Sequence, residues 1–117
     1  MMNLYEAIGC RHSVRKYTDR EVTEKLRGQI LSYFDKTSRL NDRIRVEAVI
    51  FDNTKKKADV HGLWKVDAPY YLAIYSDQEE GCERNAGYLM EQMVLYMTAK
   101  GLGTCYLVIP VILIRQL

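Results

Sequence analysis

The chain has 117 residues, of which 48% are apolar and 27% charged, and its formal net charge is +2. These values predict a single globular domain with a real core, and they exclude a disordered or strongly polycationic protein. The charge is uneven, because residues 1–46 hold ten Lys/Arg against six Asp/Glu, whereas residues 47–117 hold seven against nine. This asymmetry favours a small anionic ligand near the N-terminal half over a polyanion wrapped around the surface.

The cysteines and the distribution of apolar residues narrow the possible classes of protein further. The three cysteines are Cys10, Cys82 and Cys105, with no C-x-x-C pair and no Cys/His set at zinc-ligand spacing. We therefore expect no disulfide scaffold and no metal site, and a reducing, cytoplasmic location. The N-terminus lacks a secretory pattern, and no stretch is apolar for long enough to span a membrane.

The first two elements of the chain are predicted to be helices separated by a basic turn. Residues 3–9 fit a short helix, and Arg11–Tyr17 then gathers two guanidiniums, an imidazole, a hydroxyl and an ammonium. Such a cluster suits a phosphate monoester or a flavin phosphate, because arginine offers a planar fork of donors. A solvated basic turn is the simpler alternative. A second helix is predicted from an N-cap at Thr23 to near Ser38, with an apolar face at Leu26, Ile30, Leu31 and Phe34.

Two strands are predicted in the middle of the chain. Residues 44–51 alternate between apolar and mixed positions, which is typical of a strand with one well-buried face. Residues 70–75 are aromatic and almost wholly apolar, which indicates a strand covered on both faces. The stretch 58–67 between them is ambiguous.

The longest predicted helix covers residues near 78–100. Asp77 and Glu80 have the spacing of a capping box, and Lys100 followed by Gly101 is a C-terminal signal. Met90, Met93 and Met97 recur on one face, which we interpret as a core face and less readily as a plastic binding surface. Residues 101–107 are expected to turn into a third strand.

Three segments together resemble the nitroreductase superfamily of FMN-dependent oxidoreductases. They are Arg11–Tyr17, Ala68–Tyr75, and Asn85–Leu95 with Gly101–Cys105, and they occur in the family's order. The resemblance implies an α+β fold with a mixed sheet flanked by helices, and a homodimer with FMN at the subunit interface. It also implies a two-step exchange, in which NAD(P)H reduces the flavin and an acceptor such as a nitroaromatic or quinone reoxidises it. No catalytic side chain is expected, because the flavin carries the chemistry.

The same resemblance implies the cofactor-binding residues. Arg11, His12, Ser13 and Arg15 match the positions that hold the FMN phosphate and ribityl chain in the family. The family also has a Pro-Ser-x-x-Asn loop that contacts the flavin from the partner subunit. In residues 36–41, Ser38 and Asn41 echo this loop.

The resemblance weakens after Leu107. We therefore interpret residues 1–107 as a partial nitroreductase-like FMN-binding domain of a C-terminally truncated member, with the C-terminal part of the fold missing. Residues 108–117 are an atypical apolar tail, which we expect to pack in a dimer interface or a sheet. One alternative is a non-catalytic or degenerate flavin-binding remnant. A nucleic-acid-binding module is disfavoured, because no aromatic residues interleave with basic ones along a strand.

Overall fold

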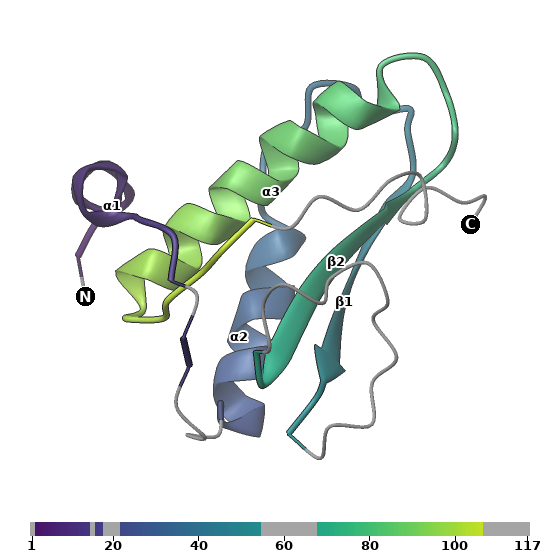
Figure 1. Cartoon of the computed structure of the whole chain (residues 1–117). Helices are drawn as coiled ribbons and strands as arrows, with labels where there is room; N and C mark the ends of the chain where they lie inside the picture. The colour runs from purple at the N-terminus through teal and green to yellow at the C-terminus, as the bar shows by residue number, and fades with distance from the viewer. Residues whose placement is uncertain (1, 15, 18–21, 55–67, 107–117) are drawn as a thin grey trace.

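The computed structural model describes residues 2–14, 16–17, 22–54 and 68–106. Their elements are α1 (Leu4–Cys10), α2 (Glu24–Phe34), β1 (Val46–Asp52), β2 (Tyr70–Ser76) and α3 (Cys82–Ala99). α3 is the longest element, and α1 lies beside its C-terminal half (Figure 1). The arrangement is α+β, as predicted.

Side-chain caps fix the starts of the first two helices. The Asn3 Oδ1 atom accepts a hydrogen bond from the Glu6 amide at 2.8 Å, and the Thr23 Oγ1 atom accepts from the Leu26 amide at 3.1 Å. The predicted cap at Thr23 is confirmed, but α2 ends at Phe34 and not near Ser38. The reason is local: the Thr37 hydroxyl and amide both donate to the Phe34 carbonyl, at 2.6 and 3.2 Å, and so close the last turn.

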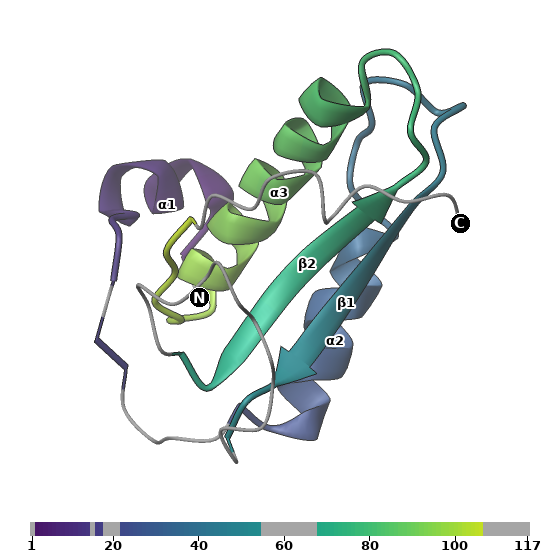
Figure 2. The same ribbon diagram turned by 45° about the vertical axis from the view of Figure 1, so that its right-hand side comes forward.

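Both predicted strands are confirmed, and they pair with each other. β1 and β2 are antiparallel, with Ala48 opposite Ile74 and Phe51 opposite Tyr71 (Figure 2). Successive side chains of a strand point to opposite faces. One face therefore packs against α2 and α3, while on the other Tyr71 is buried in a smaller cluster with Ala68, Tyr17 and Phe51.

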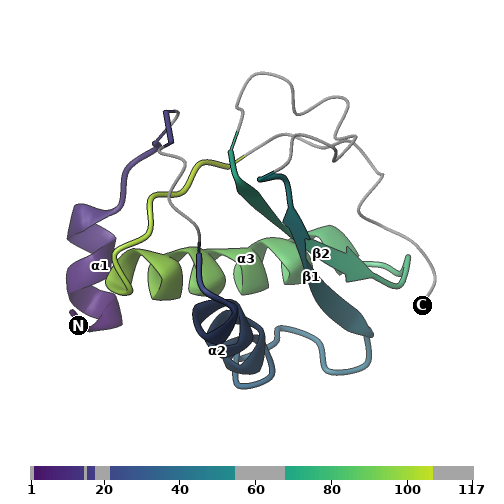
Figure 3. The same ribbon diagram turned by 90° about the horizontal axis from the view of Figure 1, so that it is seen from below.

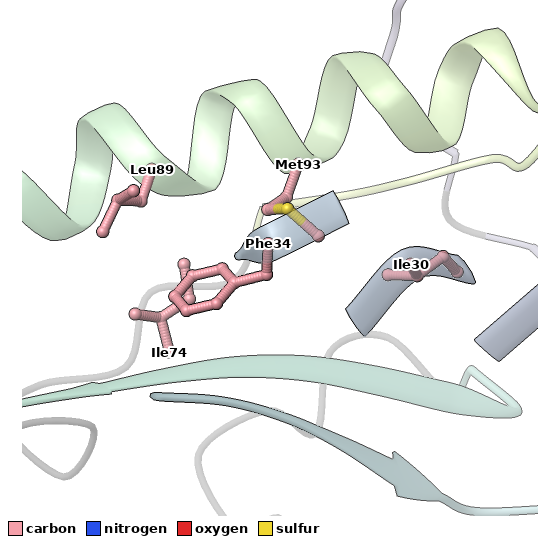
Figure 4. Close-up of a cluster of buried hydrophobic side chains, with 5 residues drawn as sticks. All are labelled: Ile30, Phe34, Ile74, Leu89 and Met93. Carbon is pink, nitrogen blue, oxygen red and sulfur yellow. The ribbon is translucent and has the colours of Figure 1, made fainter. Parts of the chain in front are cut away.

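The main core lies between this sheet and the two longer helices. Leu89 and Met93 of α3 point toward Phe34 of α2 and Ile74 of β2, with Ile30 nearby (Figure 4). Met93 is fully buried, and Met90 and Met97 pack at the edge of the cluster. The methionine stripe is thus the core face that the sequence predicts.

The two ends of α3 differ in how well the sequence predicts them. At the C-terminus, Gly101 has φ +87° and the amides of Gly101 and Leu102 donate to the carbonyls of Thr98 and Met97, which is a Schellman motif. At the N-terminus the predicted capping box is wrong, because the N-cap is Gly81 and has no side-chain bond. The Asp77 carboxylate instead binds Arg45, with 2.7 Å between Oδ2 and Nε.

The third predicted strand is also wrong within residues 102–106, where the structure shows an isolated bridge between Thr104 and Ser13 and no strand. Leu107 and the tail 108–117 lie outside the described residues. No helix in the described ranges combines the length and apolarity needed to cross a bilayer.

Candidate functional site

The basic turn after α1 is held against the segment that follows α3. Ser13 and Thr104 form a parallel bridge, and the Val14 amide donates to the Thr104 carbonyl at 2.9 Å. The two segments approach closely because Gly103 has no side chain: a Cβ atom there would lie 3.0–3.1 Å from three atoms of Val14. This contact places the predicted phosphate-binding turn next to residues that come much later in the chain.

Arg11 reaches across this contact to Tyr106. The guanidinium carbon lies 5.2 Å from the centroid of the Tyr106 ring, which is a cation–π distance. The Tyr106 hydroxyl in turn donates to the Glu91 carboxylate of α3 at 2.5 Å. Tyr106 is 46% exposed, and its partial burial and then this bond raise its pKa above the ordinary range, while the charge of Arg11 acts in the opposite direction. Tyr106 is therefore a neutral platform that orients the guanidinium.

Among the described residues of this region, three hydrogen-bonding atoms are buried and have no partner. They are Nε and Nη2 of Arg11 and the hydroxyl oxygen of Thr104. Residues paired across a bridge carry their side chains on the same side of the backbone, so Ser13 faces the same way as Thr104, although no hydrogen bond joins their hydroxyls. An unsatisfied buried donor costs about 1–3 kcal/mol, so an anion that accepts from these groups would relieve a real penalty. Guanidinium and hydroxyl donors together suit a phosphate.

The remaining residues of the predicted basic turn are placed differently. His12 is exposed, and its Nδ1 atom lies 3.1 Å from the Cys10 carbonyl oxygen. The imidazole is thus bonded to the end of α1 and does not join the unpaired donors of Arg11. Arg15 lies outside the described residues.

Ser38 contacts the middle of α3, and Asn41 contacts its first turn. The Gln92 amide side chain binds the backbone of Ser38 twice, at 3.0 and 2.8 Å, and the Asn85 Oδ1 atom accepts from the Asn41 amide at 3.2 Å. The helix rises 1.5 Å per residue, so Asn85 is roughly 20 Å from the end of α3 at Ala99. Figure 3 shows α1 at the C-terminal end of this helix. In the described residues, the hydrogen bonds of Ser38 and Asn41 are made to α3 and none joins them to Arg11 or Ser13.

Thr104 and Tyr106 are residues that sequence reasoning missed. The segment Gly101–Cys105 was marked by its resemblance, but nothing in the pattern assigns a role to the Thr104 hydroxyl. Its significance depends on the bridge to Ser13, which is a contact between distant parts of the chain. In the described ranges, no three His, Cys, Asp or Glu side chains are placed to hold a metal ion.

The fold and this donor set define an α+β domain with a basic turn held against the segment that follows its longest helix. The family model described as "Putative TM nitroreductase" matches residues 3–112 of the chain. The chain belongs to this nitroreductase family, and its general class is therefore that of an oxidoreductase. No match to the chain was found among curated proteins or among solved structures.

Proposed function

We propose that the chain is an FMN-dependent oxidoreductase that passes electrons from NAD(P)H to a nitroaromatic, quinone or similar acceptor in two successive steps. The observation that carries the proposal is the set of buried, unpaired donors on Arg11 and Thr104 beside Ser13. These groups fit the phosphate of FMN in charge and in hydrogen-bonding character. Membership of the nitroreductase family supports the flavin as the ligand. Bound flavin would supply the hydride-accepting ring, which no amino-acid side chain offers.

The proposed roles of the side chains follow from their contacts. Arg11 supplies a fixed positive charge and two free donors, and the ring of Tyr106 holds the guanidinium in place. Ser13 and Thr104 add hydroxyl donors at shorter range. His12 and Arg15 remain proposed contributors to the ribityl and phosphate contacts, and His12 would have to leave the Cys10 carbonyl to take part.

We further propose that the working unit is a homodimer. Within one chain, Ser38 and Asn41 are hydrogen-bonded to Gln92 and Asn85 of α3, and the resemblance to the family places this loop on the flavin of the partner subunit. Tyr5 and Ile8 of α1 support this assembly, because they lie three positions apart on one helical face and are 84% and 62% exposed. Apolar side chains exposed side by side favour association. The free cysteines Cys10, Cys82 and Cys105 support a reducing, cytoplasmic setting.

The flavin proposal is tested by comparing FMN with riboflavin, which lacks the phosphate. Arg11→Ala should weaken FMN binding roughly ten- to a hundred-fold, because a charge-assisted hydrogen bond is worth about 1.5–3 kcal/mol. Riboflavin binding should be weaker than FMN binding in the unmodified chain and unaffected by the substitution. Arg43→Ala is the matched control, since Arg43 is exposed and belongs to the loop after α2. Equal FMN affinity in both variants would overturn the assignment of Arg11.

A second candidate is a flavin-binding protein of the same family without catalysis. The observation that favours it is that His12, Ser38 and Asn41 do not join the donor set of Arg11 and Thr104 within one chain. The two candidates separate in a turnover assay of the FMN-loaded protein. Oxidation of NADH or NADPH that depends on an added quinone or nitroaromatic supports the enzyme. Tight FMN binding without such turnover supports the binding protein.

A further inference from the structure

A groove of about 510 Å³ lies between α2 and the C-terminal part of α3, and the proposed flavin site does not use it. Its lining carries three lysines, Lys25, Lys36 and Lys100, and no carboxylate. In the part of the chain that the structure describes, none of the three forms an ion pair. The exposed Glu24 and Asp35 adjoin Lys25 and Lys36 in the sequence, but neither carboxylate lines the groove. A groove lined by one sign of charge concentrates ions of the opposite sign.

The groove also has a rigid aromatic wall. Tyr33 of α2 stacks on Tyr96 of α3, with 4.0 Å between the ring centroids and 12° between their planes. Both rings pack against the main core cluster, so they are held from behind. Lys100 lies over the Tyr96 ring, with Nζ 5.5 Å from its centroid. One of the three charges is therefore anchored on an ordered surface.

Gly28 keeps the groove open. It lies in the interior of α2 and lines the groove, and a Cβ atom added there would meet nothing within 4 Å. Glycine weakens a helix interior relative to alanine, and packing gives no reason for it here. Departures from local helix preference without a packing reason are expected at functional sites.

The spacing of the lysines indicates the shape of the ligand. Lys25 lies in the first turn of α2, Lys36 lies two residues beyond the end of α2, and Lys100 follows α3. Three positive charges carried at separate points around one groove match an anion with several negative charges better than a single phosphate. Lysine binds phosphate as a compact point charge and does not require a fixed orientation. We propose that this groove binds an elongated anion that carries several phosphate groups, at a site separate from the flavin phosphate site.

Calorimetric titration of the whole chain with inorganic tripolyphosphate, at low ionic strength, tests the proposal. Lys25→Gln/Lys36→Gln should bind tripolyphosphate roughly tenfold more weakly, since two exposed charge contacts are lost. The control is Arg43→Gln/Arg84→Gln, which removes the same charge from exposed positions outside the groove and should bind like the unmodified chain. Equal weakening in both double variants would overturn the proposal. So would orthophosphate binding as tightly as tripolyphosphate.

A second pair of variants tests the groove without changing any charge. Gly28→Met should fill the groove and weaken tripolyphosphate binding, whereas Gly87→Met, at an exposed glycine of α3 with open space around it, should not. Thermal unfolding shows whether each variant is folded. If the lysine double variant does not fold, the comparison of Gly28→Met with Gly87→Met still tests the groove. Arg11→Ala should leave tripolyphosphate binding intact, so the test of the groove is independent of the proposed flavin site. Loss of binding in Arg11→Ala with none in Gly28→Met would place the polyphosphate at Arg11 and overturn the groove.

Discussion

Ser13 pairs with Thr104 in an isolated parallel bridge, and this pairing brings the turn after α1 onto the segment after α3. The same approach sets the Arg11 guanidinium 5.2 Å from the ring centroid of Tyr106. A hydroxyl and two guanidinium nitrogens are left buried and unpaired beside the bridge. The proposed phosphate site is therefore built at one tertiary contact, and substitutions at that contact test it most directly.

Thr104→Val should weaken FMN binding without lowering the stability of the ligand-free protein. Valine keeps the branched shape and removes a hydroxyl whose oxygen is buried without a partner. We expect the ligand-free protein to be as stable as the unmodified chain or slightly more so, because an unsatisfied group disappears. FMN affinity should fall about two- to tenfold, the worth of one ordinary hydrogen bond. FMN fluorescence titration and urea unfolding measure the two effects, and unchanged FMN affinity would remove Thr104 from the site.

Gly103→Ala should disturb the bridge by steric overlap. The new Cβ atom would lie 3.0 Å from Cγ2 and 3.1 Å from Cβ and Cγ1 of Val14, so one of the two segments must move. Overpacking of this kind costs about 1–3 kcal/mol. Adding Val14→Ala should recover part of the loss, since two of the three close atoms are the removed methyl groups. Gly87→Ala is the control and should raise stability slightly, because its surroundings are open and alanine favours the helix. Urea unfolding compares the four chains.

Asn85 should be the main anchor of the loop that follows α2. Its side chain is 1% exposed, and its Oδ1 atom accepts hydrogen bonds from the Leu40 and Asn41 amides at 3.0 and 3.2 Å. Asn85→Ala removes the acceptor of both bonds and should lower the free energy of unfolding by about 1–3 kcal/mol. Gln92→Ala also removes two bonds to the loop, but these are exposed and water can replace them, so its effect should be smaller. An equal decrease in the free energy of unfolding in the two variants would contradict the view that burial makes the Asn85 bonds more important.

Tyr106 should make stability fall at alkaline pH. Burial and the bond to Glu91 raise its pKa in the folded chain, so the folded state holds the phenol proton more tightly than the unfolded state. This contribution is complete below the unfolded tyrosine pKa of about 10 and is lost as the pH rises above it. Tyr106→Phe should flatten the decline of unfolding free energy in that range. Glu91→Gln removes one cause of the shift, and tyrosinate absorbance should show Tyr106 ionising at lower pH. A difference spectrum between the unmodified chain and Tyr106→Phe that titrates near pH 10 would contradict the assignment.

Local signals in the sequence determined the elements of this fold. The helix caps, the methionine stripe and the Lys100–Gly101 stop act over three or four residues, so the amino-acid order alone specifies them. The family also follows from the sequence, because its motifs are local strings in a fixed order. The incorrect capping box of α3 involves competition between a local and a distant partner. The Asp77 carboxylate could cap α3 or pair with Arg45, and the sheet register that brings Arg45 beside it favours the pair.

For the candidate site, the sequence determined only which types of side chain are available. Arg11 and Ser13 were identified from the chemistry of their side chains, which a sequence displays directly. Thr104 and Tyr106 acquire a role only through the Ser13 bridge and the cation–π contact, which join residues far apart in the chain. The hydrogen bonds from Ser38 to Gln92 and from Asn41 to Asn85 also join residues far apart in the chain. Contacts of this kind are set by packing, so only the tertiary structure decides them.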